Sequence, residues 1–279
     1  MADDTDRRRE LGDFLRSRRA QVQRGELGLP RLPGGSTNGL RREEVSFLSG
    51  VSMTWYTWLE QARDIQPSRQ VLEAIARTLR LSVRERAYAL ELAGYSSTNL
   101  GDLPSTRAAP EHVQRLLDAL AAYPSYAITS SWDIAAWNHG YEALYPNVAT
   151  VPTDERNLLW LVFSDPDVRA LLPDWEVDSR HFLAQFRAEA GPRLSDPSLS
   201  ALVSHLLAVS AVFARLWDIH DIEPFTSRNR RFRHSLVGDL LLEHHRLTPC
   251  GEPDLNVVIY TPADEASVIR LRKLLTTNL

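Results

Sequence analysis

The first 95 residues alternate short amphipathic segments with turn-forming residues, a pattern that predicts a bundle of helices. Residues 9–22 carry apolar side chains at helical spacing with charged residues between them, which indicates the first helix. Proline and glycine make residues 25–39 unfavourable for a helix. Further helices are predicted at 40–48, at 52–61, from 67 to about 79 and from 82 to about 94. Five short helices predict a compact all-α domain over residues 1–95.

Serines stand at two of the predicted helix starts. Ser52 precedes the third helix and is a candidate N-cap. Ser82 is followed three residues later by Glu85, the spacing of a capping box. Both serines favour helices that begin directly after them.

Residues 96–109 are rich in turn formers and predict a linker, after which strands join the pattern. Helices are predicted around 113–120, 141–145, 154–163, 178–190 and 199–217 and from Asp264 onward; strands are predicted at 127–129, 134–137, 231–235, 238–246 and 255–261. Strands near both ends with helices between them predict an α+β domain over residues 110–279, whose sheet assembles across the sequence.

The composition fits two folded domains. The 279 residues are 43% hydrophobic and 24% charged, which argues against a disordered chain. Cys250 is the one cysteine, so neither an intramolecular disulfide nor a zinc site made of cysteines is available. The first residues are polar and no long apolar run follows. We therefore expect no signal peptide and no membrane span, and we place the protein in the cytoplasm.

The net charge of −4 conceals an asymmetry between the two predicted domains. Residues 7–86 hold 16 arginines and 9 acidic residues, a balance of +7, whereas the rest of the chain holds 16 basic and 27 acidic residues. A basic N-terminal domain joined to an acidic one indicates that only the first domain meets a polyanion.

The segment 42–61 has the organisation of a helix-turn-helix. Such a unit needs a small residue where its helices cross, which Ser46 supplies, and a turn residue that tolerates positive φ, which Gly50 supplies. Val45, Val51, Tyr56 and Leu59 are spaced to bury its inner faces. An ordinary helical hairpin is the alternative interpretation. The joint pattern of turn, buried positions, five helices and local positive charge favours DNA binding.

The outward-facing residues of this segment predict a DNA-binding surface. Proteins of this kind place the start of the second helix against base edges in the major groove, while cations meet phosphates and position the unit. Thr54 offers a hydrogen bond to a base edge, and Met53 and Trp58 offer cover for a thymine methyl group. The predicted DNA-binding residues are Arg41, Arg42, Ser52, Met53, Thr54, Trp58, Arg63, Ser68 and Arg69.

The run from Gly39 to Ser52, the run from Trp55 to Gln61, and Pro67-Ser68 with Val71-Leu72 closely resemble bacterial helix-turn-helix regulators of the XRE (Cro/repressor) class. More narrowly, the chain resembles those regulators that carry a MmyB-like, MltR-type ligand-binding domain. In the second domain the resemblance is carried by Trp137-Asn138, Arg156-Asn157-Leu158, Asp174-Trp175-Glu176, Trp217 and Arg233-His234 with Val237-Gly238.

The resemblance implies that the second domain is PAS-like and holds a small apolar ligand such as a fatty acid, which modulates the affinity for an operator. Aromatic residues of this domain are candidates for the walls of a pocket, although aromatics at helical spacing are more often core. Cationic residues are candidates for neutralising a carboxylate, Arg228 and Arg230 among them. The predicted ligand-binding residues are Trp132, Trp137, Trp160, Phe163, Phe182, Phe186, Phe213, Trp217, Arg156, Arg231 and His234.

The expected function is that of a sequence-specific transcription regulator that binds double-stranded DNA as a homodimer, because a palindromic operator matches a two-fold symmetric protein. We expect no enzymatic activity, no cofactor and no metal, since no phosphate loop, nucleophile elbow or zinc-binding pair of histidines occurs. His220 between Asp218 and Asp221 resembles a metal set only superficially. The alternatives are a small-molecule-binding or protein-interaction module without operator function, and an unrecognised hydrolase or oxidoreductase.

Overall fold

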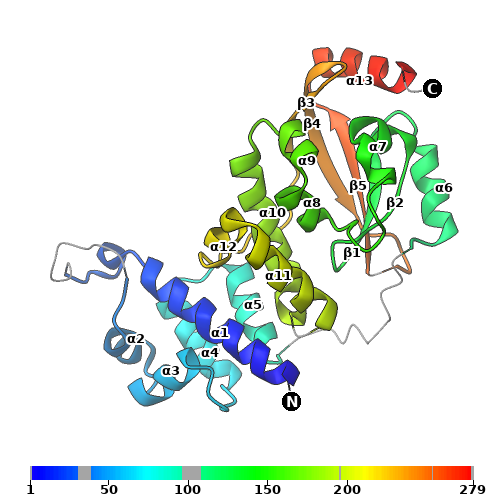
Figure 1. Ribbon diagram of the computed structural model, residues 1–279. Coiled ribbons are helices and arrows are strands. Elements are labelled where there is room, and N and C mark those ends of the chain that lie inside the picture. The colour runs from blue at the N-terminus through cyan, green and yellow to red at the C-terminus, as the bar shows by residue number, and fades with distance from the viewer. Residues whose placement is uncertain (1, 31–38, 96–107, 195, 253, 278–279) are drawn as a thin grey trace. The chain divides into compact units, whose positions relative to one another are not determined.

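The computed structural model describes residues 2–30, 39–95, 108–194, 196–252 and 254–277 (Figure 1). Contacts group the chain into two compact units. The first contains residues 1–101, 187–203 and 215–223, and the second contains residues 102–186, 204–214 and 224–279. Domains at 1–95 and 110–279 stay a prediction. Apart from Ala108 and Ala109, the predicted linker at 96–109 lies outside the described residues.

The first unit contains the five predicted helices. They are α1 (Ala2–Gln21), α2 (Arg42–Ser49), α3 (Met53–Glu60), α4 (Arg69–Thr78) and α5 (Val83–Leu92). The predicted caps are confirmed. The side chain of Ser52 accepts a hydrogen bond from the Trp55 amide at 3.2 Å, and Ser82 and Glu85 form a reciprocal capping box. The helices begin where these side chains satisfy amides that lack a partner within the helix.

The first helix begins seven residues earlier than its apolar spacing predicts. Its first turns carry ion pairs between Arg8 and Asp4 at 3.3 Å and between Arg9 and Asp6 at 3.0 Å. Pairs at this spacing support a helix without any apolar face. A short 3₁₀ helix, η1 (Arg24–Leu27), lies in part of the segment predicted to be non-helical.

The core of the first unit is formed by the inward faces of its helices. Phe14 of α1 packs edge-on against Tyr88 of α5 with ring centroids 5.2 Å apart. Val45, Tyr56 and Ile75 contribute from α2, α3 and α4, and each is fully buried. Burial of these side chains, at about 25 cal/mol for each Å² of apolar surface, holds the short helices together.

Segments distant in sequence complete the first unit. They come from the last turn of α10 (Trp175–Ala190), from η3 (Gly191–Arg193) and the start of α11 (Pro197–Val209), and from the end of α12 (Ala211–Trp217). The 3₁₀ helix η3 contacts α1 and α5. A Cβ atom at Gly191 would collide with the ring of Tyr88, so this approach requires glycine.

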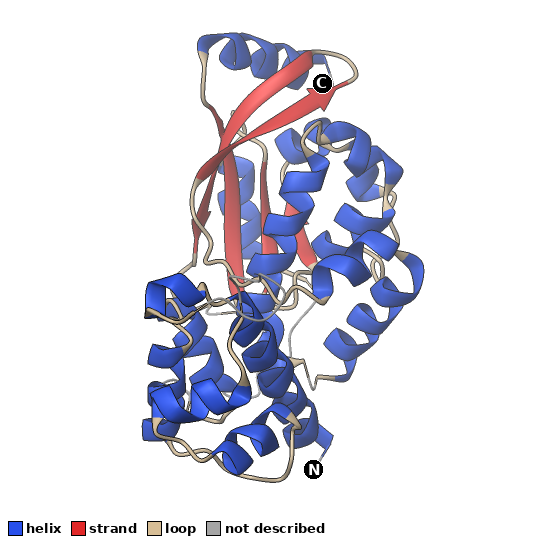
Figure 2. Cartoon of the chain, turned by 90° about the vertical axis from the view of Figure 1, so that its left-hand side faces the viewer, coloured by secondary structure: helices blue, strands red, loops and turns tan. Residues whose placement is uncertain are grey.

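The second unit is built on a five-stranded antiparallel sheet, which confirms the α+β fold class (Figure 2). Its strands are β1 (Ser125–Thr129), β2 (Ile134–Trp137), β3 (Arg228–His234), β4 (Gly238–Leu247) and β5 (Leu255–Pro262); its other helices are α6 (Glu111–Ala119), α7 (His139–Leu144), η2 (Pro146–Ala149), α8 (Leu158–Ser164), α9 (Pro166–Leu171) and α13 (Glu265–Thr277). The strand order is β2-β1-β5-β4-β3, so the last strand in sequence lies at the centre.

Different side chains pack on the two faces of the sheet. On one face Ala127 and Val257, which are register partners in β1 and β5, pack with Leu117 of α6 in an apolar cluster. On the other face Tyr126 and Tyr260 stack with ring centroids 6.3 Å apart. Because side chains alternate along a strand, the tyrosines and the alanine-valine pair necessarily lie on opposite faces.

Two predicted helices differ in detail from the structure, and one helix is additional. The helix predicted at 199–217 is two helices, α11 and α12, and the hydroxyl of Ser210 accepts a hydrogen bond from the Phe213 amide at 3.2 Å where the second begins. The helix predicted at 154–163 begins at Leu158, since the Asn157 side chain caps it. Helix α9 was not predicted; Asp165 caps it and Pro166 is its first residue.

Candidate functional site: a helix-turn-helix and a cavity lined by an arginine

The turn between α2 and α3 has the predicted geometry. Gly50 has a φ of 71°, in the left-handed region, and its amide donates to the carbonyl of Ser46 at 3.0 Å. The hydroxyl of Ser46 donates to the carbonyl of Val51 at 2.6 Å across the turn. The four predicted inner residues, Val45, Val51, Tyr56 and Leu59, are all buried. These contacts fix the angle at which α3 leaves α2.

The start of α3 is open to solvent. Ser52, Met53 and Thr54 are exposed, and Trp58 is half-buried one turn later. The guanidinium of Arg63 lies 5.6 Å from the centre of the Trp58 ring, which orients the indole at the end of the helix. Within the first unit, this surface offers hydroxyl, thioether and indole groups side by side.

The two arginines before α2 have different surroundings. Arg41 is exposed, and its backbone amide donates to Glu44 Oε2 at 2.7 Å. Arg42 donates from Nε to Glu60 Oε2 at 2.7 Å, and Arg19 donates to Glu60 Oε1 at 2.6 Å. Burial raises the pKa of Glu60, but the hydrogen bonds from the two arginines outweigh it and lower that pKa below its ordinary value. The charge of Arg42 is therefore already paired with the buried carboxylate of Glu60.

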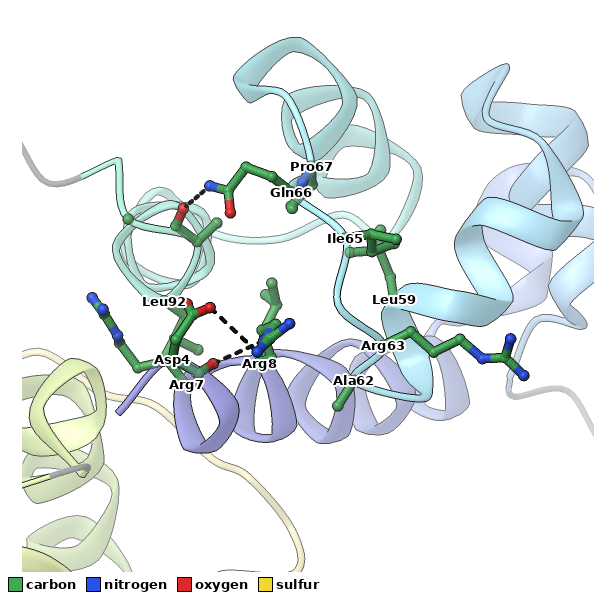
Figure 3. Close-up of a pocket in the computed structure, with 13 residues that line it drawn as sticks. Asp4, Arg7, Arg8, Leu59, Ala62, Arg63, Ile65, Gln66, Pro67 and Leu92 are labelled. Carbon is green, nitrogen blue, oxygen red and sulfur yellow. Dashed lines mark hydrogen bonds and ion pairs between the residues drawn. The ribbon is translucent and has the colours of Figure 1, made fainter. Parts of the chain in front are cut away.

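The remaining predicted DNA-binding residues flank this surface. Ser68 caps α4 by accepting from the Val71 amide at 3.3 Å, and Arg69 is exposed beside it. Figure 3 shows a pocket of about 90 Å³ between α1, the connection from α3 to α4 and the end of α5. Arg8 is held there by Asp4, whereas the side chain of Arg63 extends away from the pocket.

A cavity of about 40 Å³ lies on the tyrosine face of the sheet, within the second unit. Most of its wall is aliphatic or aromatic, and its one charged lining residue is the arginine of β3. The lining residues are Tyr141, Leu144, Tyr145, Leu158, Leu161, Val162, Val168, Leu171, Leu172, Phe182, Arg230, Phe232 and Tyr260. An apolar wall with a few polar groups at fixed positions is typical of a small-molecule site, whereas the volume is well below the roughly 300–1,000 Å³ of most such sites.

Arg230 is 3% exposed and supplies the charge of this cavity. Its Nε donates to Asp178 Oδ1 at 2.9 Å, its Nη1 lies 3.4 Å from the hydroxyl of Tyr260, and its guanidinium lies 4.2 Å from the centre of the Phe182 ring. Its Nη2 is buried and has no hydrogen-bond partner among the described residues. A buried donor without a partner is costly, so this nitrogen is suited to an acceptor that the protein itself does not provide.

A wider depression of about 230 Å³ adjoins the cavity and shares Leu144, Tyr145 and Leu171 with its lining. His234, one of the predicted ligand-binding residues, lines this depression. Its Nδ1 accepts from the Leu236 amide at 3.2 Å and its Nε2 lies 3.0 Å from the Ala143 carbonyl. Burial lowers the pKa of His234, which favours a neutral ring that bridges two backbone groups.

The structure does not bring the predicted ligand-binding residues together at one place. Phe182 lines the cavity. The other aromatic residues of that set are absent from its lining and make contacts elsewhere: Trp132 packs edge-on against Phe182 and Phe186, Phe163 packs against Phe213, Trp160 packs against His205, Trp137 lies under Arg156, and Trp217 lies under Arg187. Trp132, Phe186 and Phe213 are buried core residues, and the other four rings are half-buried.

The predicted cations also lie apart from the cavity. Arg156 donates to the carbonyl of Val151 at 2.7 Å. Arg231 is exposed and paired with Asp174 at 2.5 Å. Arg230, its neighbour on β3, supplies the charge of the cavity that was predicted for Arg231.

His220 belongs to an ion cluster. It lies 3.4 Å from Glu10 Oε1 in the first unit. The described residues contain no group of three histidine, cysteine, aspartate or glutamate side chains arranged to hold a metal ion. Among these same residues, no helix combines the length and the apolarity needed to cross a membrane.

Comparisons with known proteins agree with this arrangement. Residues 10–90 match the family model of a helix-turn-helix domain, and residues 109–274 match that of the MmyB-like transcription regulator ligand binding domain. No curated protein matches the chain. The second match covers more than half of the chain, and the cavity with Arg230 lies inside it. The chain therefore belongs to the MmyB-like family of DNA-binding transcription regulators, with a helix-turn-helix domain followed by a ligand-binding domain.

Proposed function

We propose that the protein binds an operator sequence through α3 and that a small apolar acid in the second unit modulates this binding. The single observation that carries the first part is the open, capped start of α3 behind a glycine turn. Ser52, Met53, Thr54 and Trp58 read base edges there, which is where helix-turn-helix proteins place such side chains. Arg41, Arg42, Arg63, Ser68 and Arg69 meet the phosphates.

The protein acts on DNA as a homodimer. One recognition helix reads only a few base pairs, and two copies related by a two-fold axis read a palindrome whose half-sites lie about 34 Å apart. The basic balance of residues 7–86 supports a surface that meets the polyanion.

The ligand is an apolar molecule with a carboxylate, such as a fatty acid, held by a PAS-like domain. The unpartnered Nη2 of Arg230 supports a carboxylate, because a guanidinium has five donors and Asp178 and Tyr260 leave some of them unused. The cavity of about 40 Å³ and the depression of about 230 Å³ that adjoins it support an alkyl chain along Leu144 and Leu171. The sheet order β2-β1-β5-β4-β3 with helices inserted after β2 supports the PAS-like assignment.

A titration with fatty acids of about 6 to 16 carbons and with the matching alcohols tests the ligand. Thermal shift and calorimetry on the full chain are expected to show that acids bind and that alcohols of equal length bind at least about tenfold more weakly. An alcohol accepts from Arg230 with a single uncharged oxygen and forms no ion pair. R230K keeps a cation beside Asp178 but removes the forked donors, so it is expected to abolish the preference for the acid.

R231K is the informative comparison, because Arg231 is the neighbouring residue that the sequence favours. It is expected to keep the preference for the acid. Equal binding of acids and alcohols by the wild-type chain, or loss of the preference in R231K alone, would contradict the role given to Arg230. If neither acids nor alcohols bind, the proposal of an acyl ligand is wrong.

A further inference from the structure

A buried ion cluster joins the helix-turn-helix domain to a segment that the chain supplies much later. Arg187 is 1% exposed, and its Nη1 donates to Glu10 Oε1 of α1 at 2.5 Å. The same nitrogen lies 2.7 Å from His220 Nδ1, and Nη2 donates to the Trp217 carbonyl at 2.5 Å. The hydroxyl of Tyr88 donates to Glu10 at 2.9 Å. All five residues belong to the first unit.

The cluster holds its charges tightly. Burial raises the pKa of Glu10, but the positive charge of Arg187, with further help from His220 and Tyr88, more than compensates and lowers that pKa to about 2. Removing one partner from such a pair leaves the other buried and uncompensated, which costs far more than breaking an exposed pair. The position of Arg187 relative to α1 is therefore strongly specified.

Arg187 stands on the same helix as two residues of the ligand cavity. Helix α10 is continuous from Trp175 to Ala190, and its residues up to Phe186 belong to the second unit. Asp178 Oδ1 accepts from Nε of Arg230 at 2.9 Å. Phe182 lines the cavity, and the guanidinium of Arg230 lies over its ring. At about 100° per residue, the nine steps from Asp178 to Arg187 place them on opposite faces of α10.

We infer that α10 is the element through which the cavity acts on DNA binding, with Asp178 and Arg187 as the positioning residues at its two ends. The inference rests on the proposed function, since it names how that same cavity regulates α1. A carboxylate that accepts from Nη2 of Arg230 adds a second negative charge beside the guanidinium; this charge repels Asp178 and weakens the hold of β3 on α10. A helix can move as a unit, so a shift at Asp178 displaces Arg187 and takes from the buried Glu10 its main positive partner.

A double-mutant cycle without ligand or DNA tests this coupling in the full chain. D178N weakens the hold on Arg230 from within the protein. The background E10Q/R187M removes both charges together, so that neither is left buried alone. The measurement is hydrogen exchange of the α1 amides around Glu10. D178N is expected to speed this exchange at least about fivefold in the wild-type background and less than about twofold in E10Q/R187M.

D174N is the matched control. Asp174 directly precedes α10 and pairs with Arg231 on the exposed side of β3, so its removal is expected to leave exchange in α1 unchanged. Equal effects of D178N in both backgrounds, no effect in either, or an effect of D174N as large as that of D178N would overturn the inference. If E10Q/R187M fails to fold, Arg187→Lys serves as the background, since it keeps a positive charge beside Glu10 but lacks the forked donors of the guanidinium.

A parallel titration with decanoate separates this inference from the proposed function. If decanoate binds and changes the operator affinity while the mutant cycle is additive, the proposed function stands and α10 is rejected as the coupling element. A non-additive cycle in a chain that does not bind decanoate would keep the coupling and reject the acyl ligand.

Discussion

Glu60 is the carboxylate on which the packing of α3 against α1 depends. Its side chain is fully buried, and its two oxygens accept from Arg19 and Arg42. A buried carboxylate is stable only while such partners remain, so each arginine contributes to folding whatever it does on DNA. Arg41, one residue earlier, does not contact Glu60. The sequence alone assigns both arginines to phosphate contacts, whereas the structure also gives Arg42 a contact that supports folding.

Arg41→Ala is expected to weaken binding about equally on all DNA sequences and to reduce the slope of log K against log salt by about one. The reason is that Arg41 is exposed and free to neutralise one phosphate. Arg42→Ala is expected to do the same and also to lower the melting temperature by roughly 2–4 °C, the shift that about 1 kcal/mol produces in a chain of this size. Binding isotherms at several salt concentrations and a thermal melt measure both effects.

A melting temperature in Arg42→Ala equal to that of the wild type would show that Arg19 alone suffices for Glu60. A change of sequence preference in Arg41→Ala with an intact salt slope would contradict the phosphate contact.

Thr54→Ala and Trp58→Ala are expected to relax base preference instead. Each removes a group aimed at a base edge, and each such group supplies about 1–3 kcal/mol of discrimination between bases. Selection of bound sequences from a random pool, compared between the variants and the wild type, measures this directly. Val83→Ala, at an exposed site on α5, is the control and should leave the selected sequence unchanged.

At the scale of elements, the turn between α2 and α3 depends on a backbone conformation at Gly50 that other residues adopt only with strain. Gly50→Ala is expected to destabilise the first unit by about 1 kcal/mol, because an alanine at a φ of 71° is strained although open space surrounds its Cβ. Gly25→Ala, which also points into open space but has no positive φ, is the control. Urea unfolding followed by circular dichroism compares the two; equal stability of both variants would contradict the strain.

Local patterns predict the helices better than they predict the cavity. Ser52, Ser82 and Gly50 act on atoms a few residues away, so their roles are legible in the sequence. The arginine of the cavity depends on which face of β3 is buried. Side chains alternate along a strand, so Arg231 and His234, both predicted for the ligand, necessarily lie on opposite faces. Arg230 is among the candidate cations of the sequence, and the period of two, which places it on the same face as His234, is the signal that favours it over Arg231.

The predicted elements omit two helix starts that local patterns mark: Ser210 caps α12, and Asp165 with Pro166 begins α9. Other contacts have no local signal. Glu10 and Arg187 meet across 177 residues of sequence. Nothing in the spacing of either residue indicates its partner, because the partner is chosen by the packing of whole segments.

At the scale of the whole molecule, stability is expected to fall as the pH falls below 6.5. Burial, reinforced by the nearby charge of Arg230, lowers the pKa of His244 from 6.5 to about 3, so the native protein keeps this ring neutral while the unfolded chain takes up a proton. The stabilising contribution is complete above pH 6.5 and is lost toward pH 3. At about 1.4 kcal/mol for each pKa unit, the decrease between about pH 6.5 and about pH 5 reaches up to about 2 kcal/mol.

His244→Gln is expected to flatten this dependence, because an amide can keep a hydrogen bond with the Arg228 carbonyl but does not titrate. The free energy of unfolding in urea at about pH 5 and about pH 7.5 measures it for both proteins. A slope as steep in the variant as in the wild type would show that other groups, His234 among them, carry the proton uptake.

The dimer is tested on DNA. Footprints on a selected operator are expected to show two protected half-sites about 10 base pairs apart, or a multiple of that distance, and the protein is expected to sediment as a dimer on that DNA. A protein that remains a monomer at micromolar concentration and protects one half-site would contradict this assembly.

The late segments of the first unit have a consequence for synthesis on the ribosome. At about 5–20 residues per second, residue 223 follows residue 95 by roughly 6–26 s. For roughly the first 5–18 s of that interval, until residue 187 is made, Glu10 and Tyr88 are present while Arg187 and His220 are not. The nascent chain then presents Glu10 without its arginine partner beside the apolar residues of α1 and α5, and we expect chaperones that recognise apolar surface to bind it before its second half is translated.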